Sequence, residues 1–187
     1  TLQVTQTITA TSCVTTTPVY SVTINANPAP VITSSNTTVC SGAIGETYSV
    51  VLVAGRSYNW TVSGGTITAG AGTNSITVTW GASGGGNVSV VESVISTGCS
   101  GNASQAIVIN ANPVPVVSGD NNVCANEQNV IYSTPAVAGH TYSWSVTGGV
   151  IDGSATGNSV VIDWGAAGAG TLQVTQTITA TSCVTTT

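Results

Sequence analysis

Hydrophobic and hydroxyl-bearing residues alternate along several stretches of this chain. Between residues 76 and 80, Ile76, Val78 and Trp80 are separated by threonines, and residues 172–180 repeat the pattern with leucine, valine and isoleucine. A period of two places apolar side chains on one face of a β-strand and hydroxyls on the other. No stretch shows the apolar stripe of an amphipathic helix. The pattern therefore predicts an all-β protein.

Glycine-rich clusters separate these stretches. Examples are residues 63–65, 69–74 and 81–86, where glycine accepts the positive φ angles of tight connections. Short strands separated by turns at intervals of roughly 8–12 residues are typical of a small β-sandwich. In a unit of roughly 85 residues we expect about seven antiparallel strands.

The sequence repeats itself at two levels. Residues 1–17 recur letter for letter as residues 171–187, as in a segment cut from a periodic array. A second, more diverged repeat places like residues 84 positions apart. These pairs are Cys40/Cys124, Tyr48/Tyr132, Tyr58/Tyr142, Trp60/Trp144, Gly64/Gly148, Gly65/Gly149, Trp80/Trp164, Gly81/Gly165 and Cys99/Cys183. The chain thus carries one module twice.

The repeats predict the domain organisation. Residues 27–111 form a complete module, the first module, and residues 112–187 form a second module that lacks its last strand. Residues 1–26 match the end of a preceding module, and the missing strand should match Pro18 to Ala26. Both chain ends then fall inside a module, so we expect flanking modules of a longer polymer to supply the missing parts.

The composition narrows the range of possible functions. Charged residues make up 4% of the chain, against about 25% in ordinary globular proteins, and the net charge is -5. One arginine and no lysine make nucleic acid an unsuitable partner, and no apolar run approaches the roughly 18 residues of a membrane span. The carboxylates fall in no recognisable motif and have no acidic counterpart in the other module. We expect them to be solvated, and we expect neither catalysis nor a cofactor.

Two motifs resemble a known family. Each module has a Tyr-x-Trp strand followed by a Gly-Gly turn, at residues 58–65 and 142–149, and then a strand ending in Trp-Gly at Trp80 and Trp164. With the flanking cysteines, these motifs resemble the polycystic-kidney-disease-like (PKD-like) immunoglobulin-fold repeats of secreted and surface proteins of Bacteroidota. They lack the Gly-Asp-Gly turn of better-studied PKD domains. The resemblance implies an extracellular spacer, adhesive or assembly module without catalytic residues.

The five cysteines are candidates for covalent cross-links. Pairing Cys40 with Cys99 and Cys124 with Cys183 inside each module would leave Cys13 to bond a cysteine outside the sequence. Such a bond closes a loop of about 60 residues, stabilises by about 4 kcal/mol and implies oxidising surroundings. Because Cys40 and Cys124 precede the second strand of a sandwich, bonds between modules or chains remain the alternative. No Cys-x-x-Cys or histidine cluster suggests a metal.

The Tyr-x-Trp motifs offer two interpretations. Tyr58 and Trp60, like Tyr142 and Trp144, project from one face of a central strand, where a small sandwich needs its largest core residues. The alternative is an aromatic platform that binds a glycan. We favour core packing.

Two further pairs are candidate surface contacts. Trp80 and Trp164 close a strand just before glycine-rich turns, where they either cap the core or remain partly exposed. Arg56 and His140 occupy matching positions in the loop before the Tyr-x-Trp strand, the only charge position that the modules share. They are either solvated loop residues or a contact between neighbours.

Together these features predict a structural protein. Proline-containing joints at residues 25–30 and 110–115 favour extended, semi-rigid geometry, and strands nearly free of charge need their edges covered. The leading hypothesis is a repeat of a long extracellular filament or surface adhesin stalk, with neighbouring modules or chains as partners. One alternative is a glycan-binding accessory module of a secreted polysaccharide-degrading enzyme. Another is a filament subunit that polymerises by donating residues 18–26 as the missing strand.

Overall fold

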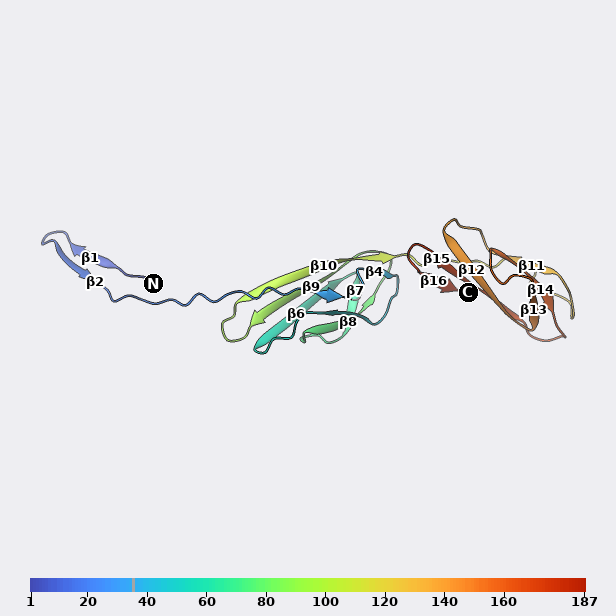
Figure 1. Ribbon diagram of the computed structural model, residues 1–187, viewed down its shortest axis with the longest axis horizontal. Helices are drawn as coiled ribbons and strands as arrows, with labels where there is room; N and C mark the ends of the chain where they lie inside the picture. Colours follow the sequence, from blue (N-terminus) through green and yellow to red (C-terminus); the bar gives the residue numbers. More distant parts are fainter. Residues whose placement is uncertain (35) are drawn as a thin grey trace.

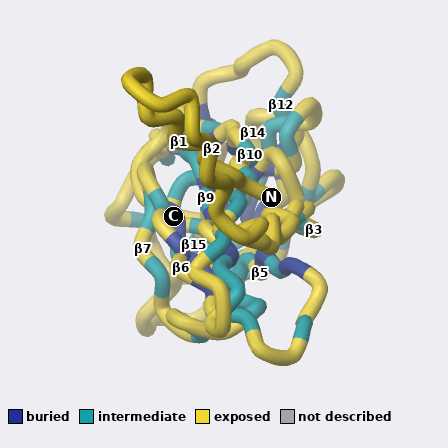
Figure 2. Tube along the Cα trace, turned by 90° about the vertical axis from the view of Figure 1, so that its left-hand side faces the viewer, coloured by how far each residue is buried: buried dark blue, intermediate teal, exposed yellow. Residues whose placement is uncertain are grey.

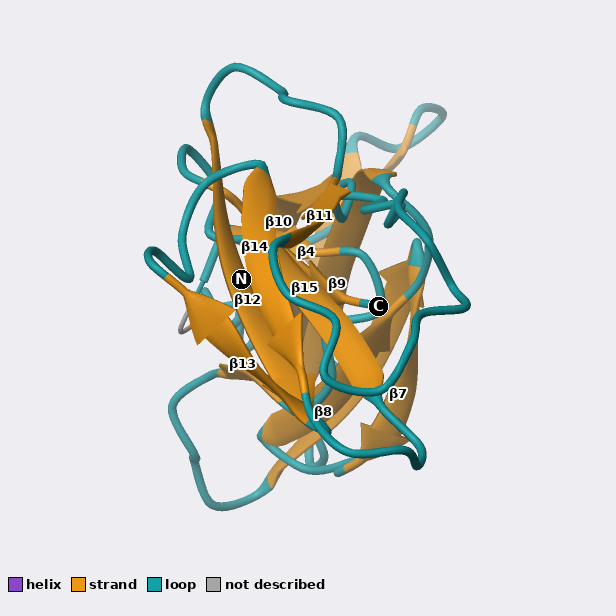
Figure 3. Cartoon of the chain, turned by 90° about the vertical axis from the view of Figure 1, so that its right-hand side faces the viewer, coloured by secondary structure: helices purple, strands orange, loops and turns teal. Residues whose placement is uncertain are grey.

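Strands and turns build the described chain. The computed structural model describes residues 1–34 and 36–187, and these residues contain no helix (Figure 3). Three parts follow one another along a line: a hairpin at the N-terminus, the first module and the second module (Figure 1). The all-β class predicted from the alternating pattern is confirmed.

The first module is a sandwich of two four-stranded sheets. Its strands are β3 (Thr33–Ser34), β4 (Thr38–Cys40), β5 (Glu46–Ser49), β6 (Arg56–Ser63), β7 (Gly65–Ala69), β8 (Ser75–Trp80), β9 (Gly84–Val94) and β10 (Ser100–Asn110). One sheet has the order β4-β10-β9-β6 and the other the order β3-β5-β8-β7. Neighbouring strands pair antiparallel, except that β4 runs parallel to the end of β10. This parallel pair lies where the chain leaves the module.

Alternation decides which side chains enter the core. In β8, Ile76, Val78 and Trp80 are buried, whereas the threonines between them are partly exposed. Burying each such side chain contributes about 1.5–3 kcal/mol, so the alternating strands supply most of the driving force for folding. Other strands add Val39, Tyr48, Tyr58, Trp60, Val88, Val90, Ile107 and Ile109 to the same cluster.

The second module repeats this sandwich with fewer strands. They are β11 (Val130–Ser133), β12 (His140–Thr147), β13 (Gly149–Asp152), β14 (Ser159–Trp164), β15 (Thr171–Ile178) and β16 (Val184–Thr186). The sheets have the orders β11-β14-β13 and β12-β15-β16. The counterparts of β3 and β4 are not strands, and β16 has 3 residues against 11 in β10. The second sandwich is therefore open along one edge.

The N-terminal hairpin joins β1 (Thr5–Ile8) to β2 (Cys13–Thr16). The identical residues of the second module form β15 and β16 in the same register. A bridge between Leu2 and Tyr20 extends the hairpin in the way that Val88 and Gln105 pair in the first module. Every residue of β1 and β2 is exposed, as the yellow tube at the N-terminus shows (Figure 2). One sequence thus forms the same hairpin with and without a sandwich beneath it.

Candidate functional site

The joint between the two modules is the candidate functional site. Cys40 ends β4 and lies opposite Asn110, the last residue of β10, in the parallel pair. The Ser41 N–H donates to the Asn110 carbonyl at 2.8 Å, and the Asn112 side-chain amide donates to the Ser41 carbonyl at 2.9 Å. These bonds hold Cys40 beside the chain at the point where it passes into the second module.

Cys183 reaches the same joint from the second module. It follows the turn after β15, in which Ser182 has a φ of 59° and the Ile178 N–H donates to the Cys183 carbonyl at 2.9 Å. Cys40 and Cys183 form a disulfide with a Cα–Cα distance of 5.5 Å across a sequence separation of 143. Cys183 is 0% exposed, so the bond is shielded on that side. The two modules are therefore linked twice, by the backbone and by this disulfide.

This disulfide corrects the predicted pairing of Cys40 with Cys99 and of Cys124 with Cys183. β10 begins after Cys99 and ends beside Cys40, and its 11 residues span roughly 35 Å at about 3.3 Å each. A disulfide requires a Cα–Cα distance of roughly 4.4–6.8 Å, so two cysteines at opposite ends of one sandwich cannot pair. The bond between modules, which the sequence left open, is the one that forms. Cys13, Cys99 and Cys124 carry free thiols.

The Tyr-x-Trp residues lie in the core. Tyr58, Trp60, Tyr142 and Trp144 are all buried. The Tyr58 hydroxyl accepts the Val53 N–H at 2.8 Å, and its counterpart Tyr142 accepts from the matching loop at 2.9 Å. The indole N–H groups of Trp60 and Trp144 donate to carbonyls at 2.8 and 2.9 Å. Their polar atoms thus hold loops in place, and the rings present no platform to a glycan.

Trp80 and Trp164 differ in exposure although their positions match. Trp80 is 2% exposed, so of the two alternatives that the sequence left open it caps the core and is no surface contact. Its indole N–H donates to Tyr48 at 3.2 Å, and burial, opposed by this hydrogen bond, raises the pKa of the Tyr48 hydroxyl. Trp164 makes the matching bond to Tyr132, also at 3.2 Å, yet stays partly exposed. The difference lies in what covers each indole ring.

Arg56 and His140 each contact a residue of their own module. The Arg56 guanidinium lies 2.6 Å from the Glu92 carboxylate, which is buried on β9. At the matching positions, His140 Nδ1 lies 2.7 Å from the Gln176 amide nitrogen. The prediction that Glu92 is solvated is therefore wrong. Sequence reasoning missed it because the partner of Glu92 is 36 positions away, in a strand pairing that only the fold reveals.

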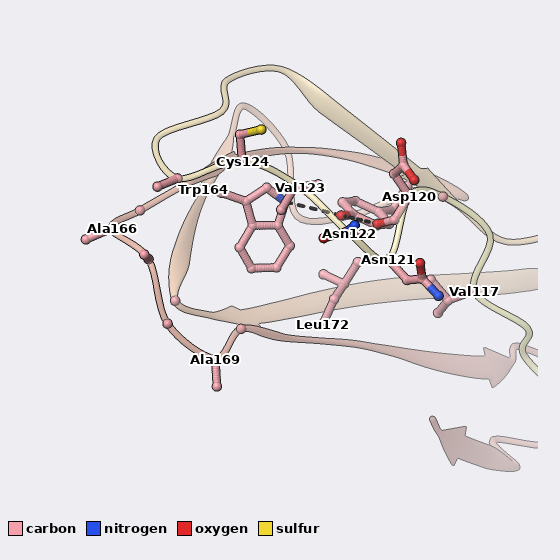
Figure 4. A pocket seen from close by; sticks show the side chains of 18 residues that line it. Val117, Asp120, Asn121, Asn122, Val123, Cys124, Trp164, Ala166, Ala169 and Leu172 are labelled. Atoms are coloured by element: carbon pink, nitrogen blue, oxygen red, sulfur yellow. Dashed lines mark hydrogen bonds between the residues drawn. The ribbon is translucent and has the colours of Figure 1, made fainter.

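A groove of about 570 Å³ opens along the incomplete edge of the second module (Figure 4). Trp164, Leu172 and Val123 line it together with the loop of residues 119–122 and the turn of residues 165–170. In the first module the same place is filled by the end of β10, whose Ile107 and Ile109 are buried against the core. The groove thus lies at the position that the end of β10 occupies in the first module.

Across residues 1–34 and 36–187, no group of three or more His, Cys, Asp or Glu residues is arranged to hold a metal ion. Within the same described residues, no helix has the length and apolar character needed to cross a membrane.

Comparison with known proteins adds a family. Two solved structures of Parabacteroides merdae β-glucuronidase, one with glycerol in its active site, resemble the chain with 8% and 9% identity and a TM-score of 0.33. Each likeness covers 86% of this chain and 24% of the glucuronidase, and it is too weak to support an argument. No curated protein matches the sequence. The model of the PKD-like domain matches residues 24–109 and again residues 110–187. The chain therefore belongs to the PKD-like domain family, of which it carries two tandem copies.

Proposed function

We propose that this chain is a structural repeat of a long extracellular filament or surface adhesin stalk and has no catalytic role. The observation that carries the proposal is the Cys40–Cys183 disulfide, which braces one PKD-like module against the next. A disulfide of this kind is stable outside the cell, and a covalent brace at a joint resists bending and pulling.

The joint contains further features of a stiff connection. Pro113 and Pro115, which follow the joint, are both buried. Asn110 and Asn112 on either side of residue 111 donate side-chain hydrogen bonds to β4 and to the residue after it, at 3.3 and 2.9 Å. Proline restricts the backbone and the hydrogen bonds attach the linker to the first module. The linker therefore directs the second module along the axis of the first.

The open groove supports a continuing array. Val22 and Ile24 align with Ile107 and Ile109 when residues 25–30 are superimposed on residues 110–115. Val22 and Ile24 are 53% and 92% exposed here, whereas their counterparts are buried. We propose that the groove of each second module is filled by a segment with the sequence of residues 18–26, supplied by the continuing chain. Burying two such side chains contributes about 3–6 kcal/mol.

The first test concerns completion of the second module. The full chain is extended after Thr187 by a copy of residues 18–26, and its matched control carries Val22→Asp and Ile24→Asp in the added copy. We expect the extended chain to shield Trp164 from acrylamide and to unfold at a higher temperature, whereas the control behaves like the parent. Equal quenching and equal unfolding of the two extended chains would exclude this strand as the occupant.

The second test concerns the filament. Chains with successive added copies of residues 18–187 are measured by small-angle scattering and electron microscopy. We expect the length to grow by a constant step, with an advance of about 30–40 Å for each module. Chains that collapse into compact particles would contradict the stalk. Saturable binding on a glycan array that Trp164→Ala abolishes would favour an accessory carbohydrate-binding module instead.

Electrophoresis of the native protein distinguishes a covalent array from separate subunits that are joined by strand donation. Denaturing electrophoresis under reducing conditions should show a very large single chain. A monomer or ladder based on 18.4 kDa would instead support subunits that donate residues 18–26 to one another.

A further inference from the structure

The turn that carries Cys183 has a close counterpart at Cys99. In both modules the N–H of the residue that ends the preceding strand, Val94 or Ile178, donates to the cysteine carbonyl at 2.9 Å. The residue before the cysteine has a positive φ in both turns, 72° at Gly98 and 59° at Ser182. Cys99 therefore lies at the end of the first module where the chain enters it, as Cys183 does in the second module. We call this end of a module its entry end and the opposite end, where the chain leaves, its exit end.

The turn that carries Cys40 has its counterpart at Cys124. The Cys40 carbonyl accepts the N–H of Ala43 at 3.0 Å, and the Cys124 carbonyl accepts the N–H of Glu127 at 3.2 Å. The third residue of each turn has a positive φ, 75° at Gly42 and 61° at Asn126. Cys124 is exposed beside the groove that a final strand would fill (Figure 4). It occupies the exit position of its module, as Cys40 does.

An independent contact places Cys99 at a joint. Its sulfur lies 3.9 Å from the carbonyl oxygen of Asn25, in the segment that leads into the first module. Asn25 is the counterpart of Asn110, the residue that pairs with Cys40 in the first joint. The exit cysteine of a preceding module would therefore lie next to Asn25, and so next to the Cys99 thiol.

We propose that every joint of the array is closed by one disulfide between the exit cysteine of a module and the entry cysteine of the next. Cys124 then bonds the Cys99 of the following 170-residue unit, just as Cys40 bonds Cys183 within a unit. This inference rests on the proposed array, in which residues 18–187 recur along one chain. It accounts for Cys99 and Cys124, whose thiols are free here, with a single rule.

The bond forms by two thiol–disulfide exchanges with a small disulfide such as oxidised glutathione. The Cys124 thiolate attacks one glutathione sulfur, forms a mixed disulfide and releases glutathione thiolate. The Cys99 thiolate of the next unit then attacks the Cys124 sulfur and releases the second glutathione. Two protein thiols lose two electrons in total, the glutathione disulfide gains them, and the thiol protons pass to the two released glutathiones.

The test uses the full chain ligated to a second, isotope-labelled copy of residues 18–187, so that matching peptides of the two copies differ in mass. After folding in a glutathione buffer, free thiols are alkylated and the unreduced chain is digested for mass spectrometry. We expect a peptide that joins Cys124 of the first copy to Cys99 of the second, together with a Cys40–Cys183 peptide from each copy. Only Cys13, the first Cys99 and the last Cys124 should be alkylated.

The matched control carries Cys99→Ser in the second copy alone. It should leave the first Cys124 alkylated while both Cys40–Cys183 peptides persist, which also shows that the variant folds. Alkylation of the first Cys124 and the second Cys99 in the parent chain would overturn the proposal, as would pairing of Cys40 with Cys99. Because the mapped bond lies within one chain, it does not depend on fibre formation. A chain that carries the Cys124–Cys99 bond but does not lengthen by a constant step would contradict the filament and still support the disulfide at each joint.

Discussion

The indole N–H of Trp164 donates to the hydroxyl of Tyr132 at 3.2 Å, with the two rings edge to face at 83°. Trp80 and Tyr48 have the same bond length and the same angle in the complete first module. The pair therefore has the same geometry beside the open groove as in the complete first module. The groove beside Trp164 has a pre-formed floor, which would reduce the entropy lost on binding of the proposed strand.

A glycine beside each of these tryptophans gives a first prediction. A Cβ added at Gly86 would lie 2.4 Å from Trp80, and one added at Gly170 would lie 2.3 Å from Trp164. Trp80 is enclosed, so Gly86→Ala should lower the free energy of unfolding by about 1–3 kcal/mol. Trp164 borders an open groove and can move, so Gly170→Ala should cost clearly less. Urea unfolding followed by tryptophan fluorescence compares the two, and equal losses would contradict this account of the groove.

The Arg56–Glu92 pair gives a second prediction. Glu92 is 2% exposed and depends on the guanidinium 2.6 Å away. Arg56→Ala would leave a buried carboxylate without its cation, so we expect the first module to lose about 3 kcal/mol. The double variant Arg56→His with Glu92→Gln reproduces the pair found in the second module and should stay close to the parent. A thermal unfolding series in which the single variant is no worse than the double one would refute this reading.

The fold could be predicted from the sequence because its signals are local. Alternation in residues 76–80 determines which face of β8 is buried, and the Tyr-x-Trp spacing places both rings on one face. The match between residues 18–26 and the end of β10 stays a prediction of which segment completes the second module. These inferences need only a period of two and a comparison between the modules.

The disulfide and the buried ion pair could not be predicted in this way. Both depend on which strand ends meet in space: the parallel pairing of β4 with β10 brings Cys40 to the exit end, and the β6–β9 pairing brings Arg56 to Glu92. The sequence separation of Cys40 and Cys99 suggested a loop of ordinary size, but β10 keeps these cysteines at opposite ends of the sandwich. The length of β10, which the residue spacing does not reveal, therefore determines which cysteines can pair.

The Tyr48 hydroxyl gives a third prediction, for alkaline pH. Burial raises its pKa above the ordinary value of 10.0, while the hydrogen bond from Trp80 lowers it and the nearby Glu46 raises it. Since the folded-state pKa lies above the unfolded one, the stabilisation is complete below the unfolded value and is lost as the pH rises through the folded value. The free energy of unfolding of the first module should therefore fall above about pH 10. Denaturant titrations at a series of pH values measure this.

Tyr48→Phe is the control for that titration. It removes the ionisable group, so its stability should fall less steeply at alkaline pH than that of the parent, even though loss of the Trp80 bond makes it less stable at neutral pH. Curves that run parallel at alkaline pH would show that Tyr48 is not responsible.

The last prediction concerns the cross-link itself and uses chains in which Cys13, Cys99 and Cys124 are serine, so that thiols cannot exchange. In that background, replacing both Cys40 and Cys183 by serine removes the brace without leaving a thiol. In the chain-entropy model, a disulfide that closes so long a loop stabilises the folded chain by at most about 5 kcal/mol. Because each module folds by itself, the measured stabilisation should be smaller. Even 1 kcal/mol lowers the midpoint of a domain of this size by about 4–8 °C, so calorimetry should show the second module unfolding earlier. Small-angle scattering should show a wider spread of lengths, because the joint then bends about its linker. Superimposable thermograms and scattering curves would mean that the linker and its hydrogen bonds already hold the modules in line.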